Sequence, residues 1–488
     1  MEEALLQKQR EGDEDARGRG REEGLGLSKK WGVSVQEIKR LGYLAGPLIV
    51  ANFSQYFLQV ISIMMVGHLY QLSLSSTAIA VSLSAVSGFS LLYGMSSALE
   101  TLCGQAYGAQ QYQNLGIHTY SATLSLTLVC IPISFMWLYM GKFLILIGQD
   151  PSISHEAGRF STWLIPALFA YVILQILVRF LQAQSLILPL LVSSIASLVF
   201  FIPSCWVLVF KFGLGHVGAA LAIGMSYWLN VILLGLYVMF SSACVRIRIP
   251  NSMELFRGTR EFFCLAIPSA VMICLEWWSY EFLTLLSGFL PNPKLETSVL
   301  SVCLSILTTI FTVAEGLGAA ASTRVSNELG AGNTEAARIC VCTVMFITVV
   351  ETVTVSTIIY GNREVVGYVF SNEKEVVDYV AAMAPILSLA VILNSLEGVL
   401  SGVARGCGWQ ELGAYVNLGS YYLFGIPTAA VLGFWLELRG EGLWIGIQAG
   451  AFLQSLLLCI ITTLTDWEKQ ADNARKRIFH GTSSLDWD

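Results

Sequence analysis

The chain has 488 residues, of which 55% are hydrophobic and only 13% are charged, and its formal net charge is −6. Soluble domains contain about 25% charged residues, and many of the charges here fall within residues 1–30 and after residue 464, so the middle of the chain is poorer still. This composition excludes a large soluble enzyme, a disordered protein and a nucleic-acid-binding protein, and it predicts a polytopic membrane protein.

The predicted elements begin with a charged tail at residues 1–35. This tail mixes both signs of charge and lacks the apolar core of a signal peptide, so we expect a disordered cytoplasmic segment. Mostly apolar stretches then follow, each long enough for a helix that crosses a bilayer. The twelve stretches lie at about 41–66, 74–98, 117–140, 160–178, 188–210, 216–240, 262–288, 298–321, 340–360, 376–399, 413–435 and 442–464. A second charged tail, expected to be cytoplasmic, occupies residues 466–488.

The length and continuity of the apolar stretches predict the fold class, which is all-α. Backbone groups in lipid must bond within their own segment, so such stretches form helices, whereas a β-barrel would show short alternating segments. Lys and Arg concentrate on one side of the membrane if both termini are cytoplasmic, and this arrangement requires an even number of spans.

The second half of the chain repeats features of the first half at a nearly constant offset. Gly46-Pro47 corresponds to Ile267-Pro268, and the segment Gly104–Ala109 corresponds to Ser326–Ala331. Each half contains an even number of spans, so both halves enter the membrane from the same side. We therefore expect two six-helix lobes related by a pseudo-two-fold axis along the membrane normal, with a cavity between them that opens alternately to each side.

The expected domain boundaries follow from this repeat. The N-lobe comprises residues 36–241 and the C-lobe comprises residues 262–465, and a basic cytoplasmic linker at 242–261 joins them.

Carboxylates deep in the predicted spans are the first candidates for function, because an ionisable group in a membrane is costly and usually has a use. Glu276 lies among aromatic residues, including Trp277 and Tyr280, and this arrangement suits an organic cation through charge and cation–π contact. Glu281 follows five positions later, about 140° around the helix. We expect both glutamates to couple transport, with one of them packed between helices.

The tenth predicted span contributes a second pair of candidates. Asn394 and Glu397 are three residues apart on one face of the helix, where together they could hold and orient a proton. Glu315, before a glycine-rich segment of the eighth span, could line the substrate path. We expect no basic residue to lie as deep as these acidic residues.

A polar stripe on the first predicted span supplies candidates for lining the cavity. Asn52, Gln55 and Gln59 fall on one face of an otherwise apolar helix, and such a face contacts protein or water rather than lipid. Cavity lining and hydrogen bonding between helices are both open interpretations. Trp277, Tyr280 and Glu315 complete the expected cavity.

The predicted chemistry is exchange of a proton for cargo. A carboxyl group removed from water holds its proton more firmly, so a substrate that competes for the carboxylate would couple its own export to proton entry. Sodium coupling is an alternative that would need several converging oxygen ligands. We expect a monomer in the lipid bilayer whose partners are protons and small organic molecules, with no nucleic acid.

Other classes of function have less support in the sequence. There is no P-loop and no His/Asp cluster, so we expect neither an enzyme nor a cofactor, and we expect no metal site. A channel would need a filter-like ring of carbonyl groups or charges. A flippase for lipid-linked precursors would need a cationic groove. Both stay as alternatives to the antiporter.

Three motifs resemble the plant branch of the multidrug and toxic compound extrusion (MATE) family. They are the segments 100–109, 321–333 and 400–410, and the resemblance extends over about residues 35–465. It implies twelve helices in two lobes and proton-coupled antiport of organic compounds, including xenobiotics. The implied location is the plasma membrane or the vacuolar membrane.

The resemblance also bears on individual residues. The glutamate of the family's seventh span corresponds to Glu276. The second carboxylate of the family corresponds to Asn394, while Glu397 stands one turn later. Either the carboxylate has moved along the helix or the proton chemistry of the second lobe is altered. Glu100 and Glu328, at the inner ends of spans, are implied to be structural or gating residues.

Overall fold

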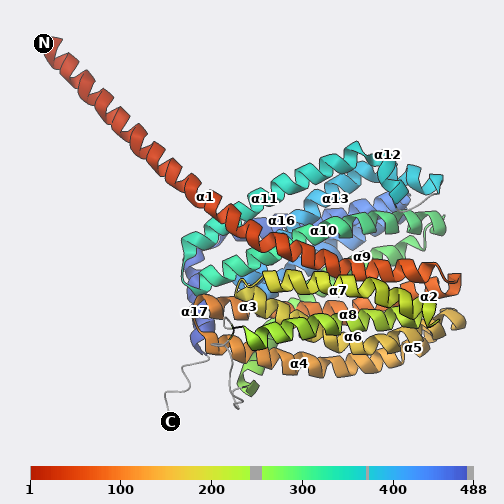
Figure 1. Ribbon diagram of the computed structural model, residues 1–488. Helices are drawn as coiled ribbons and strands as arrows, with labels where there is room; N and C mark the ends of the chain where they lie inside the picture. The colour runs from red at the N-terminus through yellow and green to blue at the C-terminus, as the bar shows by residue number, and fades with distance from the viewer. Residues whose placement is uncertain (1, 242–243, 245–254, 370–372, 481–488) are drawn as a thin grey trace.

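The computed structural model describes residues 2–241, 244, 255–369 and 373–480, and the side chains of these residues from 34 onward apart from 71, 255–257 and 480. Every regular element within these ranges is helical, and eleven helices are long and apolar enough to cross a membrane. Figure 1 shows these helices running roughly side by side, so that their ends gather at two opposite ends of the molecule. The C-terminal helix and the projecting first part of α1 lie at the same end, which we call the termini end (Figure 1).

The first half of the chain forms the N-lobe. Its elements are α1 (Glu2–Gly67), α2 (Gln71–Ser84), η1 (Ala85–Phe89), α3 (Ser90–Gly108), α4 (Tyr112–Leu138), α5 (Met140–Leu146), α6 (Pro151–Ala183), α7 (Leu188–Trp206), η2 (Val207–Lys211) and α8 (His216–Phe240). The elements α2, η1 and α3 continue one another as a single span in which η1 is a π-helical turn.

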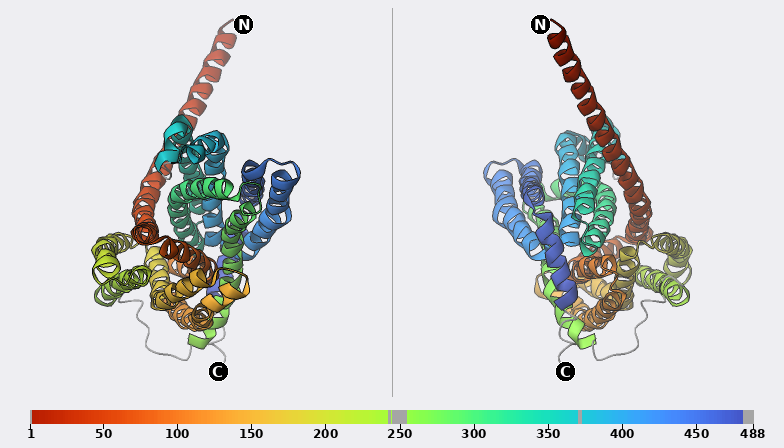
Figure 2. Two further views of the ribbon diagram at one scale, coloured as in Figure 1. Left: turned by 90° about the vertical axis from the view of Figure 1, so that its right-hand side faces the viewer. Right: turned by 90° about the vertical axis from the view of Figure 1, so that its left-hand side faces the viewer.

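The second half forms the C-lobe, which Figure 2 shows as a separate bundle beside the first. Its elements are α9 (Leu255–Ser287), α10 (Pro293–Gly330), α11 (Thr334–Gly361), α12 (Arg363–Val366), η4 (Gly367–Val369), α13 (Lys374–Cys407), α14 (Gln410–Asn417), η5 (Leu418–Gly425), α15 (Ile426–Ala430), η6 (Val431–Trp435) and α16 (Arg439–Leu464). Helix α9 packs against α3 and α4 of the N-lobe as well as against α14, so it bridges the two bundles. Most of the predicted linker at 242–261 lies outside the described residues.

The predicted span at 413–435 is interrupted more than the other spans of the described residues, because it contains two π-helical segments where the spans of α2–α3 and of α7 contain one each. Its backbone remains helical from Gln410 to Trp435, but the π-helical segments η5 and η6 interrupt the α-helical pattern. Such wider turns form where the regular backbone bonds shift, and they are frequent beside functional sites. Pro427, at the start of α15, cannot donate a backbone hydrogen bond, and this contributes to the interruption.

The two charged tails both contain helix. Residues 2–35 continue helix α1, whereas their mixed charges led us to expect a disordered segment. Residues 467–480 of the second tail form helix α17 (Trp467–His480). The Asp466 carboxylate caps this helix by accepting bonds from the backbone N–H groups of Glu468 and Lys469, at 3.1 and 3.2 Å.

The lobes meet closely at the termini end, where α3 crosses α10. A methyl group added at Gly108 would lie 2.0 Å from the carbonyl oxygen of Asn327, and one added at Gly330 would lie 2.1 Å from that of Gln105. Only glycine allows two helix backbones to approach this closely. The repeated glycines of the sequence motifs therefore form the contact between the lobes.

Candidate functional site

A cavity of about 320 Å³ lies between the lobes. Along α3 its lining residue Tyr93 precedes the Gly104–Gly108 contact, and along α10 its lining residue Glu315 precedes the contact at Ser326. The cavity thus lies on the side of the close contact that faces away from the termini end. Every predicted site residue except Glu397 lines it: Asn52, Gln55, Gln59, Glu276, Trp277, Tyr280, Glu281, Glu315 and Asn394.

Two carboxyl groups meet at the C-lobe wall of the cavity. Glu276 of α9 is 7% exposed, and Glu397 of α13 is fully buried; the carboxyl groups of these two residues interact with each other. Two ionised carboxylates repel each other, whereas a proton on either one converts the contact into a hydrogen bond. The geometry therefore suits a pair that shares one proton.

A chain of amide groups holds Glu397 in place. The amide nitrogen of Gln454, in α16, donates to Oε1 of Glu397 at 2.9 Å and to Oδ1 of Asn417 at 2.8 Å. Asn417 in turn donates to the carbonyl oxygen of Met272, at 2.7 Å. Asn417 is the last residue before η5, so the interrupted span connects directly to the carboxyl pair.

Asn394 has a different set of partners from Glu397. Its Oδ1 accepts from the Tyr280 hydroxyl at 2.5 Å, and its amide nitrogen donates to Oε1 of Gln448 at 2.9 Å. Asn394 thus positions Tyr280 on the cavity wall. The prediction that Asn394 and Glu397 share a face holds, but the structure pairs Glu397 with Glu276 rather than with Asn394.

Glu281 and Glu315 also make bonds between the lobes. The Ser82 hydroxyl donates to Glu281 at 2.9 Å, and the Tyr93 hydroxyl donates to Glu315 at 2.5 Å. The Tyr93 ring stacks on Trp277 with ring centroids 5.6 Å apart. Glu281 therefore lines the cavity and packs between helices at the same time, which combines the two positions expected for it.

The polar stripe of α1 lies at the N-lobe end of the cavity. Gln175 of α6 donates to Oε1 of Gln55 at 3.4 Å, and Gln59 interacts with the hydroxyl of Tyr227. Asn52, Gln55 and Gln59 all line the cavity, so both interpretations of the stripe apply. This end presents amides and aromatic rings, with Arg179 of α6 as its charged lining residue, in contrast to the acidic C-lobe end.

Arg179 corrects the prediction that no basic residue lies deep. It is 4% exposed, lines the cavity, and its guanidinium carbon lies 5.0 Å from the centre of the Tyr93 ring. The prediction ended the fourth span at residue 178, but α6 continues to Ala183 and carries Arg179 inside the bundle. In the sequence, the one indication of such a position was Glu100 of the first motif, because a carboxylate that becomes buried requires a cationic partner.

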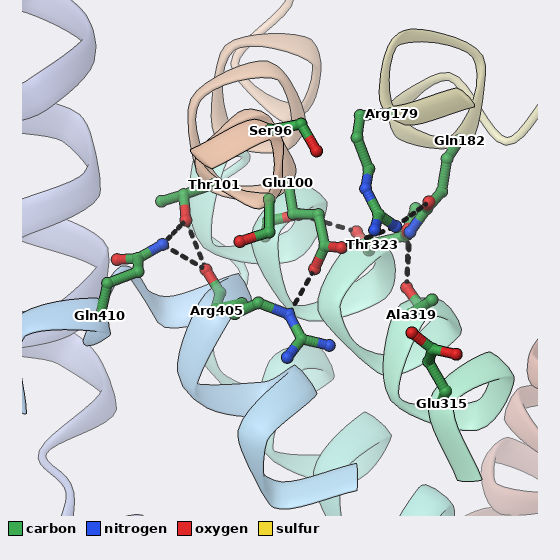
Figure 3. A network of polar contacts seen from close by, with 12 residues as sticks. Ser96, Glu100, Thr101, Arg179, Gln182, Glu315, Ala319, Thr323, Arg405 and Gln410 are labelled. Atoms are coloured by element: carbon green, nitrogen blue, oxygen red, sulfur yellow. Dashed lines mark hydrogen bonds and ion pairs between the residues drawn. The ribbon is translucent and has the colours of Figure 1, made fainter. Parts of the chain in front are cut away.

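Arg179 belongs to an ion network that joins the lobes, at the end of the cavity nearest the termini end (Figure 3). Its Nη1 lies 2.8 Å from Oε1 of Glu100, and Nε of Arg405, in α13, lies 3.0 Å from Oε2 of the same carboxylate. All three side chains are buried. Glu100 and Arg179 come from the N-lobe and Arg405 from the C-lobe, so one carboxylate bridges the interface.

Hydrogen bonds from neutral side chains extend this network (Figure 3). The Thr101 hydroxyl donates to the carbonyl oxygen of Arg405 at 2.5 Å. The amide nitrogen of Gln182 donates to the carbonyl oxygen of Ala319 and to the Thr323 hydroxyl, both at 2.9 Å. These bonds run from α3 and α6 of the N-lobe to α10 and α13 of the C-lobe.

A second ion pair joins the lobes on their other side. Arg324 of α10 contacts both carboxylate oxygens of Glu37 in α1, with its Nε 2.9 Å from Oε1 and its Nη2 3.2 Å from Oε2. Its Nη2 also lies 2.7 Å from Glu328. We call these two ion clusters, together with the glycine contact of α3 and α10, the interlobe seal.

A two-lobed helical bundle with a cavity between the lobes and a seal at one end defines a membrane transporter rather than an enzyme. The MatE family model matches residues 47–207 and 268–431, one segment in each lobe. The chain is 62% identical to Protein DETOXIFICATION 14 of Arabidopsis thaliana over 93% of both chains. It is 55% identical to Protein DETOXIFICATION 12 of the same plant over 91% of this chain and 92% of the relative.

Solved structures agree with these sequence matches. The crystal structure of the eukaryotic MATE transporter AtDTX14 superposes with a TM-score of 0.88 at 62% identity, covering 91% of this chain and 100% of that one. An outward-facing multidrug resistance MATE transporter superposes with a TM-score of 0.80 at 15% identity, over 90% and 97% of the two chains. The chain therefore belongs to the MatE family of multidrug and toxic compound extrusion transporters, as its motifs predicted.

Proposed function

We propose that this transporter is a proton-coupled antiporter that exports organic solutes, cationic or neutral, from the cytosol by alternating access. The observation that carries the proposal is the Glu276–Glu397 carboxyl pair on the cavity wall. Intramembrane carboxylates of this kind mark proton relays in transporters. The transporter works as a monomer in the plasma membrane or the vacuolar membrane.

The carboxyl pair exchanges a proton for cargo. A proton from the acidic side binds the pair and forms the hydrogen bond between the two carboxyl groups. A cationic substrate at Glu276 favours the doubly ionised pair, because the substrate's charge replaces that of the proton. Occupation by one therefore disfavours occupation by the other, which is the condition for antiport.

The substrate lies between chemically different walls. Trp277 and Tyr280 give the acidic C-lobe wall aromatic faces that attract an organic cation. At the N-lobe wall, the amides of Asn52, Gln55 and Gln59 can each donate and accept hydrogen bonds, so they suit neutral polar groups on the same molecule. An aromatic compound with a basic nitrogen and neutral polar substituents matches both walls.

The interlobe seal supports an outward-open state. The charge distribution of the sequence favours a cytoplasmic termini end, and the cavity lies on the opposite side of the seal. The Glu100–Arg405 and Glu37–Arg324 pairs join the lobes there. Both pairs must separate for the cavity to open to the cytosol, so the transport cycle breaks and remakes them.

Flux into inside-out membrane vesicles tests the proposed function. With an acidic lumen we expect uptake of ethidium, an aromatic cation, and collapse of that uptake when an ionophore dissipates the proton gradient. Uptake that follows a sodium gradient at constant pH would contradict proton coupling. Ionic currents above carrier rates would indicate a channel, and scrambling of a labelled lipid-linked precursor without ethidium uptake would indicate a flippase.

Glu397→Gln is expected to impair gradient-driven ethidium uptake more than Asn394→Ala. The glutamine can still bond to Gln454 but cannot release a proton, so we expect uptake to fall at least about tenfold. Asn394→Ala removes only a hydrogen bond that orients Tyr280, and we expect a few-fold effect, consistent with about 1 kcal/mol. Initial uptake rates at equal protein content provide the comparison.

The difference between these two variants also tests where the second carboxylate acts. Equal, mild losses in both would remove Glu397 from the exchange site. A larger loss in Asn394→Ala would assign the main role to the Tyr280–Asn394 bond.

A further inference from the structure

Helix α17 lies across the termini end and contacts both lobes. It packs against α3 of the N-lobe and against α10 and α11 of the C-lobe. Ala474 is fully buried and Ile478 is 6% exposed, so one face of the helix belongs to the protein interior. The opposite face carries exposed charged residues, including Lys476. An amphipathic helix in this place connects two bodies that move relative to each other during transport.

Arg477 makes the most direct connection between the lobes in this helix. Its Nη1 donates to Oε1 of Gln105, in α3, at 3.3 Å and to the carbonyl oxygen of Cys407 at 3.1 Å. Its Nη2 donates to the carbonyl oxygen of Gly408 at 3.4 Å. Burial lowers the pKa of the Arg477 guanidinium, and the cost of burying this charge is offset by its oxygen partners in both lobes.

The C-lobe is shaped to receive Arg477. Gly408 ends α13 with φ at +83°, a left-handed conformation that favours glycine. A methyl group at that position would lie 2.1 Å from Nη1 of Arg477. The glycine therefore both ends the helix and leaves space for the guanidinium group.

Two further hydrogen bonds hold the ends of α17 to different lobes. Near its start, the indole nitrogen of Trp409 donates to Oε1 of Gln470 at 3.1 Å. Near its end, the amide nitrogen of Asn114, in α4, donates to the carbonyl oxygen of Ile478 at 3.3 Å. The helix follows α16 after two residues, so it is tethered to the C-lobe and reaches over to the N-lobe.

We infer that α17 is a latch that stabilises the sealed, outward-open state and must release the N-lobe before the cavity opens to the cytosol. This inference rests on the proposed alternating access and adds an element that regulates it. Opening the seal moves Gln105 and Asn114 away from α13 and α16, and this movement breaks the bonds from α17 to the N-lobe. The latch thus stabilises the closed seal without contacting the substrate.

Hydrogen–deuterium exchange of the purified protein, without substrate or pH gradient, tests the latch. We expect Arg477→Gln to accelerate exchange about tenfold at the backbone amides of residues 101–108 and 322–330, because charge-assisted hydrogen bonds that hold the seal are lost. Lys476→Gln is the matched control on the exposed face of the same helix, and it should leave exchange at the seal unchanged.

Each remaining outcome decides the inference. Equal exchange in Arg477→Gln and Lys476→Gln would overturn it. If Arg477→Gln accelerates exchange throughout the molecule, the variant has destabilised the whole fold. The measurement is then repeated with Asn114→Ala, because that change removes only the bond from α4 to α17. A local acceleration at the seal in Asn114→Ala supports the latch, and an unchanged seal overturns it. Failure of the proposed antiport would be detected in the flux experiment, as ethidium uptake that needs no proton gradient. That result does not depend on the hydrogen-exchange pattern.

Discussion

Replacing Glu276 by glutamine is expected to abolish ethidium uptake driven by a proton gradient while leaving the folded protein in the membrane. The glutamine keeps the size of the side chain and can still hydrogen-bond to Glu397, so we expect stability to change by no more than about 1 kcal/mol. It cannot give up a proton on the cavity wall, so we expect coupled uptake to fall by more than about tenfold. Uptake in inside-out vesicles with an acidic lumen provides the measurement.

Glu411→Gln is the matched control for this change. Glu411 is exposed in the first turn of α14, outside the cavity, so the substitution removes one carboxylate without altering the exchange site. Gradient-driven uptake at the wild-type rate in Glu276→Gln would exclude Glu276 from coupling. Equal losses in the two variants would indicate a general effect of net charge.

Replacing Glu100 by glutamine is expected to destabilise the whole protein. The carboxylate lies between two buried arginines, and its removal leaves Arg179 and Arg405 as buried cations without their counter-charge. Removing one partner of a buried ion pair costs about 3–5 kcal/mol. We therefore expect a lower unfolding temperature in detergent, together with weaker contact between the lobes.

A double variant distinguishes loss of charge balance from a local packing defect. Arg405→Gln combined with Glu100→Gln should cost less than the sum of the two single changes, because the pair then leaves together. Glu335→Gln, at an exposed position of α11, should leave the unfolding temperature unchanged. Additive losses in the double variant would show that Glu100 and Arg405 act independently.

The sequence was sufficient to predict the membrane fold and some of the residues that line the cavity. Glu276 is conspicuous because a carboxylate interrupts a long apolar stretch, and the α1 stripe is conspicuous because its amides recur at helical spacing. Both patterns are local. The pairing of Glu276 with Glu397 depends on how α9 meets α13, and the spacing of residues along one helix contains no information about the other.

The residues that the prediction misplaced share a physical cause. Arg179 follows an apolar stretch, so counting hydropathy placed it outside the membrane, although a buried carboxylate keeps it inside the bundle. Helix α17 has no long apolar stretch, because it buries only one face against the ends of other helices. In both places contacts distant in sequence override the local pattern.

The three charged groups of the Glu100 network are divided unequally between the lobes, and this division has an electrostatic consequence. When the lobes separate, Glu100 remains with Arg179 in the N-lobe as a neutral couple, while Arg405 remains alone in the C-lobe. Under the proposed alternating access, the face of the C-lobe at the seal therefore exposes one uncompensated positive charge whenever the lobes separate there, and covers it again when they close. The electrostatic potential at this face thus differs between the two states, although no charge passes from one lobe to the other.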